Sequence, residues 1–546
     1  MGLLRDILAG LFAGQIITEG KDRLKCLMVG GSIIALEFKL VGRENKPKIT
    51  LADSFCLLPD SLANLCGPKG FNLGSTKDDI PAKYKSDMGE YRRRYPERYH
   101  GYHKRDTELL LQIVSLYRDC VNSLASVGNL KLTCGATALA VFRTGFLGID
   151  IITPGDMEMA FTRRCYQGGR CEYIGDGVLK DGTTRTFEGV NTYDINSEYP
   201  AAMAMAQFPI KPGVFIDTDY DFPRHEGEIA PGCYLVNFKQ AHGRVAIIKP
   251  WDELSERAAK HAAWSGQAYI THIEAREIEA GGGTVHLIRG YHYPETAPIF
   301  ADFVNTLYTL RMEFADKGNA SMVLVIKLVM NNLYGKFGQK ELRETFDILA
   351  IEDMLALAAE MDTAKGEKIE PQPHIHDNAF KITRVSQVRH AFPAIAAMVT
   401  AAGRQMLLEV PNQYNIPIIY CDTDSVHTQS ELPGELVDKR RLGKFKLERS
   451  ATSMAYGGRK IYIDLKEEKH KAKGVPQKSV SAMKLYAAIE KGEPYAVEYD
   501  APTGIKTALR KSIDNPNKFL HYTRTLNRDI STVDLGLVNR TWEGFG

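Results

Sequence analysis

The sequence predicts an α+β protein of several domains, and three observations point to this class. The chain has 546 residues, which at ordinary domain size corresponds to three or four domains. Residues 301–340 and 391–409 have helical character, whereas apolar runs within 27–57, 189–194 and 416–420 are typical of strands. Long helical segments set apart from strand-rich segments favour the α+β class.

Composition and charge exclude several classes of protein. Hydrophobic residues make up 44% and charged residues 25%, which excludes collagen-like, disordered and disulfide-scaffold proteins. The net charge of +2 neither requires nor excludes a polyanionic partner. Nine scattered cysteines without CxxC spacing predict a reduced, cytoplasmic protein rather than a secreted one. Residues 1–17 read as an amphipathic helix, and no stretch reaches the roughly 20 apolar residues of a membrane span.

The predicted elements follow one another along the chain. Residues 27–57 predict a hairpin, and a basic, tyrosine-rich loop over 83–105 leads into a helix over 106–123. The glycine-rich stretch 167–189 leads into the strand 189–194, and the polar stretch 361–378 is expected to be an exposed insertion. The loop over 83–105 suits a single-strand channel, because it mixes positive charge with aromatic rings. A solvated surface loop is the alternative.

The strongest local signal is the segment Tyr420-Cys-Asp-Thr-Asp-Ser425. Side chains at alternate positions of a strand share a face, so Asp422 and Asp424 are predicted to point the same way. Hard divalent ions such as Mg²⁺ favour carboxylate oxygens, usually one or two per ion together with substrate phosphates. A solvated Asp-Thr-Asp turn is the alternative interpretation.

A third carboxylate and a polar helix face extend this pattern. Asp194 ends another predicted strand, and a site of three carboxylates can hold two metal ions roughly 3.5–4 Å apart. Lys327, Asn331 and Tyr334 follow at i, i+4 and i+7, which is one face of a helix that Gly335 is expected to end. An ammonium, an amide and a ring on one face suit a nucleotide, whereas an incidental polar stripe is the alternative.

These motifs, in this order, resemble the polymerase motifs of family B DNA polymerases. Asp194-x-x-Ser-x-Tyr-Pro, Lys327-x₃-Asn-x₂-Tyr-Gly and Tyr420-x-Asp-Thr-Asp-Ser look most like the protein-primed branch of phages, linear plasmids and adenovirus-type genomes. Tyr166-Gln-Gly-Gly169 and Lys460-Ile-Tyr462 resemble two further motifs of that branch. The resemblance implies a right-hand fold of palm, fingers and thumb, with a remnant exonuclease-like (RNase H-like) α/β domain at the N-terminus.

The resemblance also implies a role for each matching residue. Asp194 and Asp424 would ligate two Mg²⁺ ions, for which Mn²⁺ can substitute, with Asp422 supporting and the Ile195 carbonyl as a further ligand. Tyr199 would exclude a ribose 2′-hydroxyl. The remaining nucleotide contacts would come from Arg311, Lys327, Asn331 and Tyr334, and the DNA contacts from Tyr166, Gly168, Gly169, Arg404, Lys460 and Tyr462. For Arg404 a helix-surface arginine is the alternative. Basic residues over 439–446 and 466–473 are expected to follow duplex backbone.

The expected division of the chain follows the motifs. It comprises an exonuclease-like remnant (1–130), the first palm segment (131–205), a terminal-protein-region-like insertion (206–300), the fingers (301–340), a second insertion (341–388), the second palm segment (389–490) and the thumb (491–546).

The N-terminal residues predict no proofreading by this chain. Tyr102-x₃-Asp106 resembles the third exonuclease motif, but residues 1–100 contain no Asp-x-Glu triplet for the first. One aspartate cannot hold two metals, so a separate exonuclease polypeptide or a mis-assigned start codon is expected.

The sequence thus predicts a monomeric, template-directed DNA polymerase. Its expected partners are a DNA primer–template, dNTPs, a terminal protein that primes synthesis and a separate exonuclease subunit. The alternative is a decayed polymerase that only binds DNA; reverse transcriptases typically carry Tyr-x-Asp-Asp instead. Glu198 and Asn332 depart from the family's frequent Leu and Ser, and Glu198 leaves nucleotide selectivity open.

Overall fold

The computed structural model of the chain describes most of its residues. These are residues 23–29, 32–39, 48–81, 84, 88–175, 185–217, 221–241, 243, 245–259, 261–340, 342–348, 351–371, 379–385, 388–502 and 519–526. The helix expected over 1–17, and parts of the expected thumb, lie outside the described residues.

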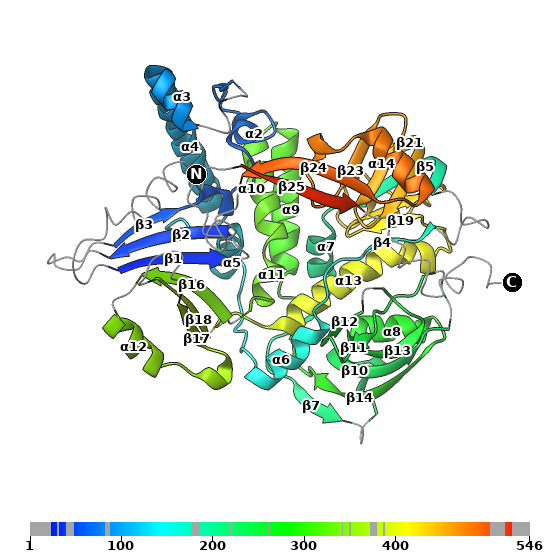
Figure 1. Cartoon of the computed structure of the whole chain (residues 1–546). Coiled ribbons are helices and arrows are strands. Elements are labelled where there is room, and N and C mark those ends of the chain that lie inside the picture. The colour runs from blue at the N-terminus through cyan, green and yellow to red at the C-terminus, as the bar shows by residue number, and fades with distance from the viewer. Residues whose placement is uncertain are drawn as a thin grey trace.

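A seven-stranded antiparallel sheet collects strands from distant parts of the chain (Figure 1). Its order is β23-β22-β21-β5-β20-β19-β4. The strands are β4 (Cys171–Tyr173), β5 (Thr186–Ile195), β19 (Tyr420–Asp422), β20 (Ser425–Thr428), β21 (Phe445–Gly458), β22 (Ile461–Asp464) and β23 (Lys469–Ala472). The strand expected over 189–194 is confirmed within β5. The strand expected over 416–420 begins only at Tyr420, because Pro417 has no N–H for a ladder.

Helices hold the other polar motifs. They are α7 (Glu198–Met205), α9 (Ala301–Asp316), α10 (Ala320–Asn331), α11 (Tyr334–Phe337) and α13 (Pro393–Asn412). One of them, α13, shares a hydrophobic core with this sheet. The helical character of 301–340 and 391–409 is confirmed. However, α10 ends at Asn331 and Tyr334 begins the separate α11, so the expectation that Gly335 ends the helix was wrong.

The N-terminal half is more helical than the sequence predicted. Its helices are α2 (Leu62–Cys66), α3 (Met88–Arg94), α4 (Pro96–Leu124), α5 (Cys134–Gly145) and α6 (Asp156–Cys165). The loop expected over 83–105 is therefore wrong from Met88 onward. Pro96 stands at the first position of α4, where proline is tolerated, and the glutamates and arginines of this stretch are good helix formers.

A six-stranded sheet joins the N-terminal strands to a segment some 300 residues later (Figure 1). Its order is β17-β18-β16-β1-β2-β3, with β1 (Arg23–Val29), β2 (Ser32–Lys39), β3 (Lys48–Ala52), β16 (Leu342–Ile348), β17 (Lys368–Pro371) and β18 (Ala379–Val385), and α12 (Ile351–Ala359) lies between β16 and β17 in sequence. The antiparallel β2–β3 pair confirms the expected hairpin. Every pairing in this sheet is antiparallel, and the sheet crosses the expected division between residues 1–130 and 341–388. That division stays a prediction.

Residues 206–300 form a compact unit below α13 in Figure 1. A four-stranded sheet, β13-β10-β14-β7, is covered by α8 (His272–Ala280). Its strands are β7 (Val214–Asp217), β10 (Gly232–Lys239), β13 (Ser265–Thr271) and β14 (Thr284–His292). Short pairs accompany it: β6 (Phe208–Pro209) with β15 (Thr296–Ala297), β8 (Arg224–His225) with β9 (Glu228–Ile229), and β11 (Trp251–Asp252) with β12 (Arg257–Ala258). The last described elements are α14 (Ala482–Lys491), β24 (Tyr495–Pro502) and β25 (Phe519–Leu526).

The largest hydrophobic core lies where α5, α9, α10, α11 and α13 meet. Phe142 packs against Phe300, Phe303 and Phe337, with ring centroids 5.2, 5.6 and 6.3 Å apart. None of the helices in the described residues is long and apolar enough to cross a membrane.

Replacing Phe142 by alanine should lower the free energy of unfolding by about 3–5 kcal/mol, because the ring is fully buried and leaves a cavity. Urea unfolding of the whole chain measures this change. Phe55→Ala is the control: that ring is 56% exposed, and its loss should change stability by about 0.5 kcal/mol or less. Equal effects of the two substitutions would contradict the described core.

Candidate active site

Two carboxylates meet where the β19–β20 hairpin pairs with β5. Ser425 lies opposite Asp422 on one side and opposite Asp194 on the other. The turn residue Thr423 has a φ of +63°, and the Ile195 amide donates to the Asp424 carbonyl at 2.7 Å. Asp194 and Asp424 are thus brought together as predicted. The reason differs, because β19 ends at Asp422 and Asp424 belongs to the turn rather than to a continuous strand.

Burial and neighbouring carboxylates raise the pKa of both Asp194 and Asp424. Burial raises the pKa of Asp194 to about 7, and the nearby Asp424 and Glu448 add to this shift. Burial likewise raises the pKa of Asp424. Lys327 lowers the pKa of both groups, so its ammonium faces the site from α10. Two carboxylates that resist ionising together form a place where a cation is strongly favoured.

Asp422 has a different role from its neighbours. Its two oxygens accept hydrogen bonds from the Lys460 ammonium at 2.6 and 2.8 Å. Lys460 itself has a φ of +56°, and its amide donates to the Tyr420 hydroxyl at 3.1 Å. Tyr462 lies beside Tyr420 with ring centroids 5.5 Å apart. The Asp422 charge is therefore neutralised within the chain, which suits a supporting residue better than a metal ligand.

Two tyrosine rings, one from α7 and one from α11, lie next to each other. The rings of Tyr199 and Tyr334 lie 4.7 Å apart. A Cβ at Gly169 would stand 2.6 Å from the Tyr199 hydroxyl and 2.8 Å from Thr423 Cγ2, so only glycine allows this approach. Arg311 reaches the same corner, donating to the Ser197 hydroxyl at 3.1 Å. Asn331 and Lys327 are exposed on α10.

Arg404 is buried, which contradicts the alternative of a helix-surface arginine. Its guanidinium donates to the carbonyls of Gln167 and Gly168 at 2.7 and 3.0 Å and to Glu274 at 2.7 Å. The cause is that α13 packs against α6, α7 and α8, which cover most of its surface. Tyr166 packs over Gly338 at the other end of this loop. Arg404 therefore positions residues 166–169, and a direct DNA contact stays a prediction.

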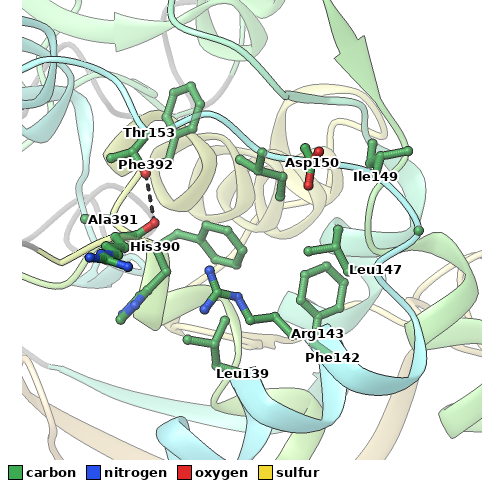
Figure 2. A pocket seen from close by; sticks show the side chains of 14 residues that line it. Leu139, Phe142, Arg143, Leu147, Ile149, Asp150, Thr153, His390, Ala391 and Phe392 are labelled. Atoms are coloured by element: carbon green, nitrogen blue, oxygen red, sulfur yellow. Dashed lines mark hydrogen bonds between the residues drawn. The ribbon is translucent and has the colours of Figure 1, made fainter.

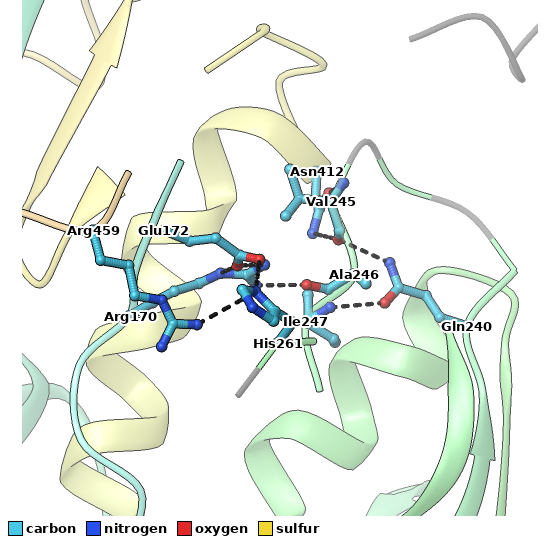
Figure 3. A network of polar contacts seen from close by, with 9 residues as sticks. All are labelled: Arg170, Glu172, Gln240, Val245, Ala246, Ile247, His261, Asn412 and Arg459. Carbon is cyan, nitrogen blue, oxygen red and sulfur yellow. Dashed lines mark hydrogen bonds and ion pairs between the residues drawn. The ribbon is translucent and has the colours of Figure 1, made fainter. Parts of the chain in front are cut away.

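A buried polar network behind this loop was missed by the sequence analysis (Figure 3). Arg170 donates to Glu172 at 2.6 Å and to the Ala246 carbonyl, and both charged side chains are at most 2% exposed. The Arg170 carbonyl accepts from the Thr423 amide at 2.6 Å. Strand alternation alone could not identify these two residues, because their partners lie about 75 and 250 residues away.

An open cavity of about 880 Å³ lies on the carboxylate site. Asp194, Asp422 and Asp424 line one side of it. The other side carries Lys446, Glu448, Arg449, Lys469, His470 and Lys471. Lysines expected to follow duplex backbone thus border the carboxylates. Glu448 was missed, although it stands two residues from Lys446 on β21.

A second cavity, of about 430 Å³, lies apart from the carboxylates (Figure 2). Apolar side chains such as Phe142 and Phe392 form its floor, with Arg143, Asp150 and His390 at its edge. The Thr153 hydroxyl donates to the Arg389 carbonyl at 2.8 Å across one side.

The two exonuclease-like residues lie together on α4. Asp106 accepts from the Lys77 ammonium at 3.0 Å, and this ammonium lies 5.0 Å from the centre of the Tyr102 ring. In the described residues no set of three His, Cys, Asp or Glu side chains is arranged to hold a metal on its own. The pair Asp194 and Asp424 still fits Mg²⁺, which commonly takes one or two carboxylates and completes its shell with phosphates and water.

Replacing Asp194 by asparagine should stabilise the metal-free protein more at pH 8 than at pH 5. The folded pKa of about 7 lies above the ordinary value of 3.8, so stability from this group falls as pH rises from about 4 to 7. Asparagine does not ionise, so Asp194→Asn does not lose this stability as pH rises. The difference in the free energy of unfolding should be roughly 1 kcal/mol once solvent screening of the carboxyl is allowed for.

Thermal unfolding in a chelator at the two pH values measures the difference. Asp422→Asn is the matched control, because it removes an attraction to Lys460 and should destabilise at pH 8. A larger stabilisation by Asp194→Asn at pH 5 would contradict the electrostatic account.

The comparisons with known proteins agree with this geometry. Residues 95–431, more than half of the chain, match the family described as DNA polymerase type B, organellar and viral. The DNA-directed DNA polymerase of Enterobacteria phage PRD1 is 27% identical over 416 residues, covering 75% of this chain and 65% of that protein. A probable DNA polymerase of Ascobolus immersus is 23% identical over 484 residues, covering 81% of this chain and 38% of that protein. The chain thus spans less than two thirds of the length of these relatives.

A solved structure shows the same fold. The DNA polymerase of phage phi29, in complex with primer–template DNA and incoming nucleotides, matches with a TM-score of 0.65 at 16% identity. The match covers 92% of this chain and 84% of that one, which confirms the predicted right-hand architecture. By its sequence motifs, its paired carboxylates and its fold, this chain belongs to the organellar and viral family of type B DNA polymerases.

Proposed function

We propose that this chain is a template-directed DNA polymerase that adds deoxynucleotides to a primer 3′-hydroxyl. The observation that carries the proposal is that Asp194 and Asp424 line one open cavity, with Lys327 close enough to act on the charge of both. Phosphoryl transfer requires mainly alignment and neutralisation of charge, and these side chains offer both.

Asp194, Asp424 and the Ile195 carbonyl would hold two divalent cations, Mg²⁺ in the cell. Bound there, the ions would supply Lewis-acid activation of the attacking oxygen and charge neutralisation at the phosphates. Asp422 keeps Lys460 beside the site, where its ammonium lies near the primer end. The raised pKa values of the two ligand carboxyls support this assignment, because a cation relieves the repulsion between them.

The incoming nucleotide lies between α7, α10 and α11. Lys327 binds the triphosphate, with Arg311 assisting from α9. Asn331 and Tyr334 border the base pair, and Tyr199 lies under the sugar and excludes a 2′-hydroxyl. The close approach of Tyr199 to Tyr334 and Gly169 supports this role, because these contacts hold the ring in one position.

The DNA contacts flank this pocket. Tyr166, Gly168 and Gly169 meet the template backbone on a loop that Arg404 holds in place. Lys460 and Tyr462 hold the primer terminus, and Lys446, Lys469 and Lys471 add positive charge along the cavity. Phosphate contacts of this kind position DNA without reading its sequence.

Priming by a terminal protein is part of the proposal. The unit formed by the described residues of 206–300 packs on α13 through α8 and β13, and we assign to it the surface that receives a priming protein. A labelled deoxynucleotide that becomes linked to a protein, and not to a DNA end, is the product that distinguishes this priming. We infer that the enzyme acts as a monomer in the cytoplasm of its host.

Asp424→Ala should reduce primer extension at least about a thousandfold, because one ligand of both ions is lost. Extension of a labelled primer–template with dNTPs and Mg²⁺ measures this. Asp119→Ala is the matched control, since that side chain is 62% exposed on α4 and far from the site in sequence and role. DNA binding by a wild-type chain that never extends the primer would instead favour a non-catalytic scaffold.

The chain should not trim a mismatched 3′ end in the absence of dNTPs. The one recognisable exonuclease carboxylate, Asp106, is paired with Lys77, and a single carboxylate cannot hold two ions. Gel analysis of a 3′-mismatched, 5′-labelled primer with Mg²⁺ tests this. Trimming by the wild type that disappears in Asp106→Ala would contradict the prediction.

A further inference from the structure

Glu198 is a buried carboxyl group with no hydrogen-bond partner among the described residues. It opens α7, directly after Ser197, whose φ of +53° turns the chain into the helix. The side chain is 3% exposed, and neither of its oxygens has a partner. Buried polar groups nearly always have a hydrogen-bond partner. A buried carboxyl without one, close to the proposed reaction site, is therefore a candidate to bind a group of the substrate.

The carboxyl lies in a notch of α13 that exists because residue 403 is glycine. A Cβ at Gly403 would stand 3.0 Å from Glu198 Oε1 and 3.3 Å from Tyr199 Cε1. The carboxyl and the edge of the Tyr199 ring therefore border the same small space. An apolar side chain of similar size would fill this space without needing a hydrogen bond.

The surroundings of Glu198 favour its neutral form. Burial raises the pKa of Glu198 well above its usual range, and Asp424 and Asp194 act in the same direction while Arg404 opposes them. A neutral carboxyl group carries both a hydrogen-bond acceptor and a donor.

Tyr199 separates this carboxyl from the nucleotide site. Its hydroxyl faces Gly169, its ring faces Tyr334, and its other edge borders the notch at Gly403. A polar group that displaces the ring comes next to Glu198. In the proposed reaction that group is the 2′-hydroxyl of a ribonucleotide, which can both donate and accept a hydrogen bond.

We propose that Glu198 is a specificity-determining residue behind Tyr199, whose carboxyl binds the 2′-hydroxyl of a ribonucleotide that pushes Tyr199 aside. The chain consequently discriminates against ribonucleotides less strongly than the same pocket with an apolar residue at 198. The inference rests on the proposed polymerase function and deepens it. In this proposal Tyr199 is the steric barrier, and the Glu198 carboxyl behind it supplies a hydrogen-bonding group.

The first test compares Glu198→Leu with Glu198→Gln, which are close in size to glutamate. The measured quantity is kcat/KM for a dNTP divided by kcat/KM for the matching rNTP. Glu198→Leu should raise this ratio about tenfold or more, because a site that hydrogen-bonds a hydroxyl favours substrates that carry it. Glu198→Gln keeps an acceptor and a donor, so its ratio should stay within about threefold of wild type.

The second test needs only the wild-type chain. A 2′-fluoro group is slightly smaller than a hydroxyl and cannot donate a hydrogen bond, so a purely steric barrier accepts the fluoro nucleotide more readily. The wild type should instead use the ribonucleotide at least as well as the 2′-fluoro nucleotide, and Glu198→Leu should reverse this order.

A wild type that prefers the fluoro nucleotide, or a ratio unchanged in Glu198→Leu, would overturn the inference while leaving the polymerase function intact. If the wild type extends primers neither with deoxynucleotides nor with ribonucleotides nor with 2′-fluoro nucleotides, the proposed function itself is overturned. The two failures are therefore distinguishable.

Discussion

The site depends on one arrangement, in which the carboxylates of Asp194 and Asp424 are held close together. Their mutual repulsion would separate them if the backbone were free to move. β5 carries Asp194, and the β19–β20 turn carries Asp424; the Ile195 amide fixes the second against the first. Sheet pairing on both sides of β20 opposes the repulsion. The stability of the seven-stranded sheet therefore keeps the two carboxylates close together.

Neighbouring residues adjust this arrangement rather than create it. Lys460 neutralises Asp422, and Lys327 approaches from α10, which belongs to another part of the fold. The aromatic core beneath α10, α11 and α13 fixes the position of that helix relative to the sheet. A chemical site built from separate elements thus relies on the packing between them.

The polar motifs could be recognised in the sequence because each motif is local. Asp194, Lys327 and Asp424 could be recognised from the spacing of a few residues, and the strands and helices that carry them follow from short-range periodicity. What could not be predicted depends on distant packing. Arg404 looks like a surface residue until α6 and α8 cover its helix, and the Arg170 side chain binds the Ala246 carbonyl on a segment with no sequence signature.

Two further differences have the same origin. The tyrosine-rich stretch after Met88 was interpreted by its charge and aromatic content, which describe a surface, whereas helix propensity decided its backbone. The pairing of β1 with β16 joins residues more than 300 positions apart, and no local pattern specifies such a partner. Composition predicts what a segment can contact, but not which strand it pairs with.

The Arg170 segment carries a consequence for engineering by exchange of parts. The Arg170 carbonyl accepts a hydrogen bond from the Thr423 amide in the turn. The Arg170 side chain donates to the carbonyl of Ala246, which belongs to the 206–300 unit. A chimera that receives this unit from a relative therefore needs residues 170–172 from the same donor. If the 206–300 unit is exchanged alone, its residue at position 246 has to fit an Arg170 from a different protein. A poor fit would shift the Arg170 backbone, which binds the Thr423 amide in the turn that carries Asp424.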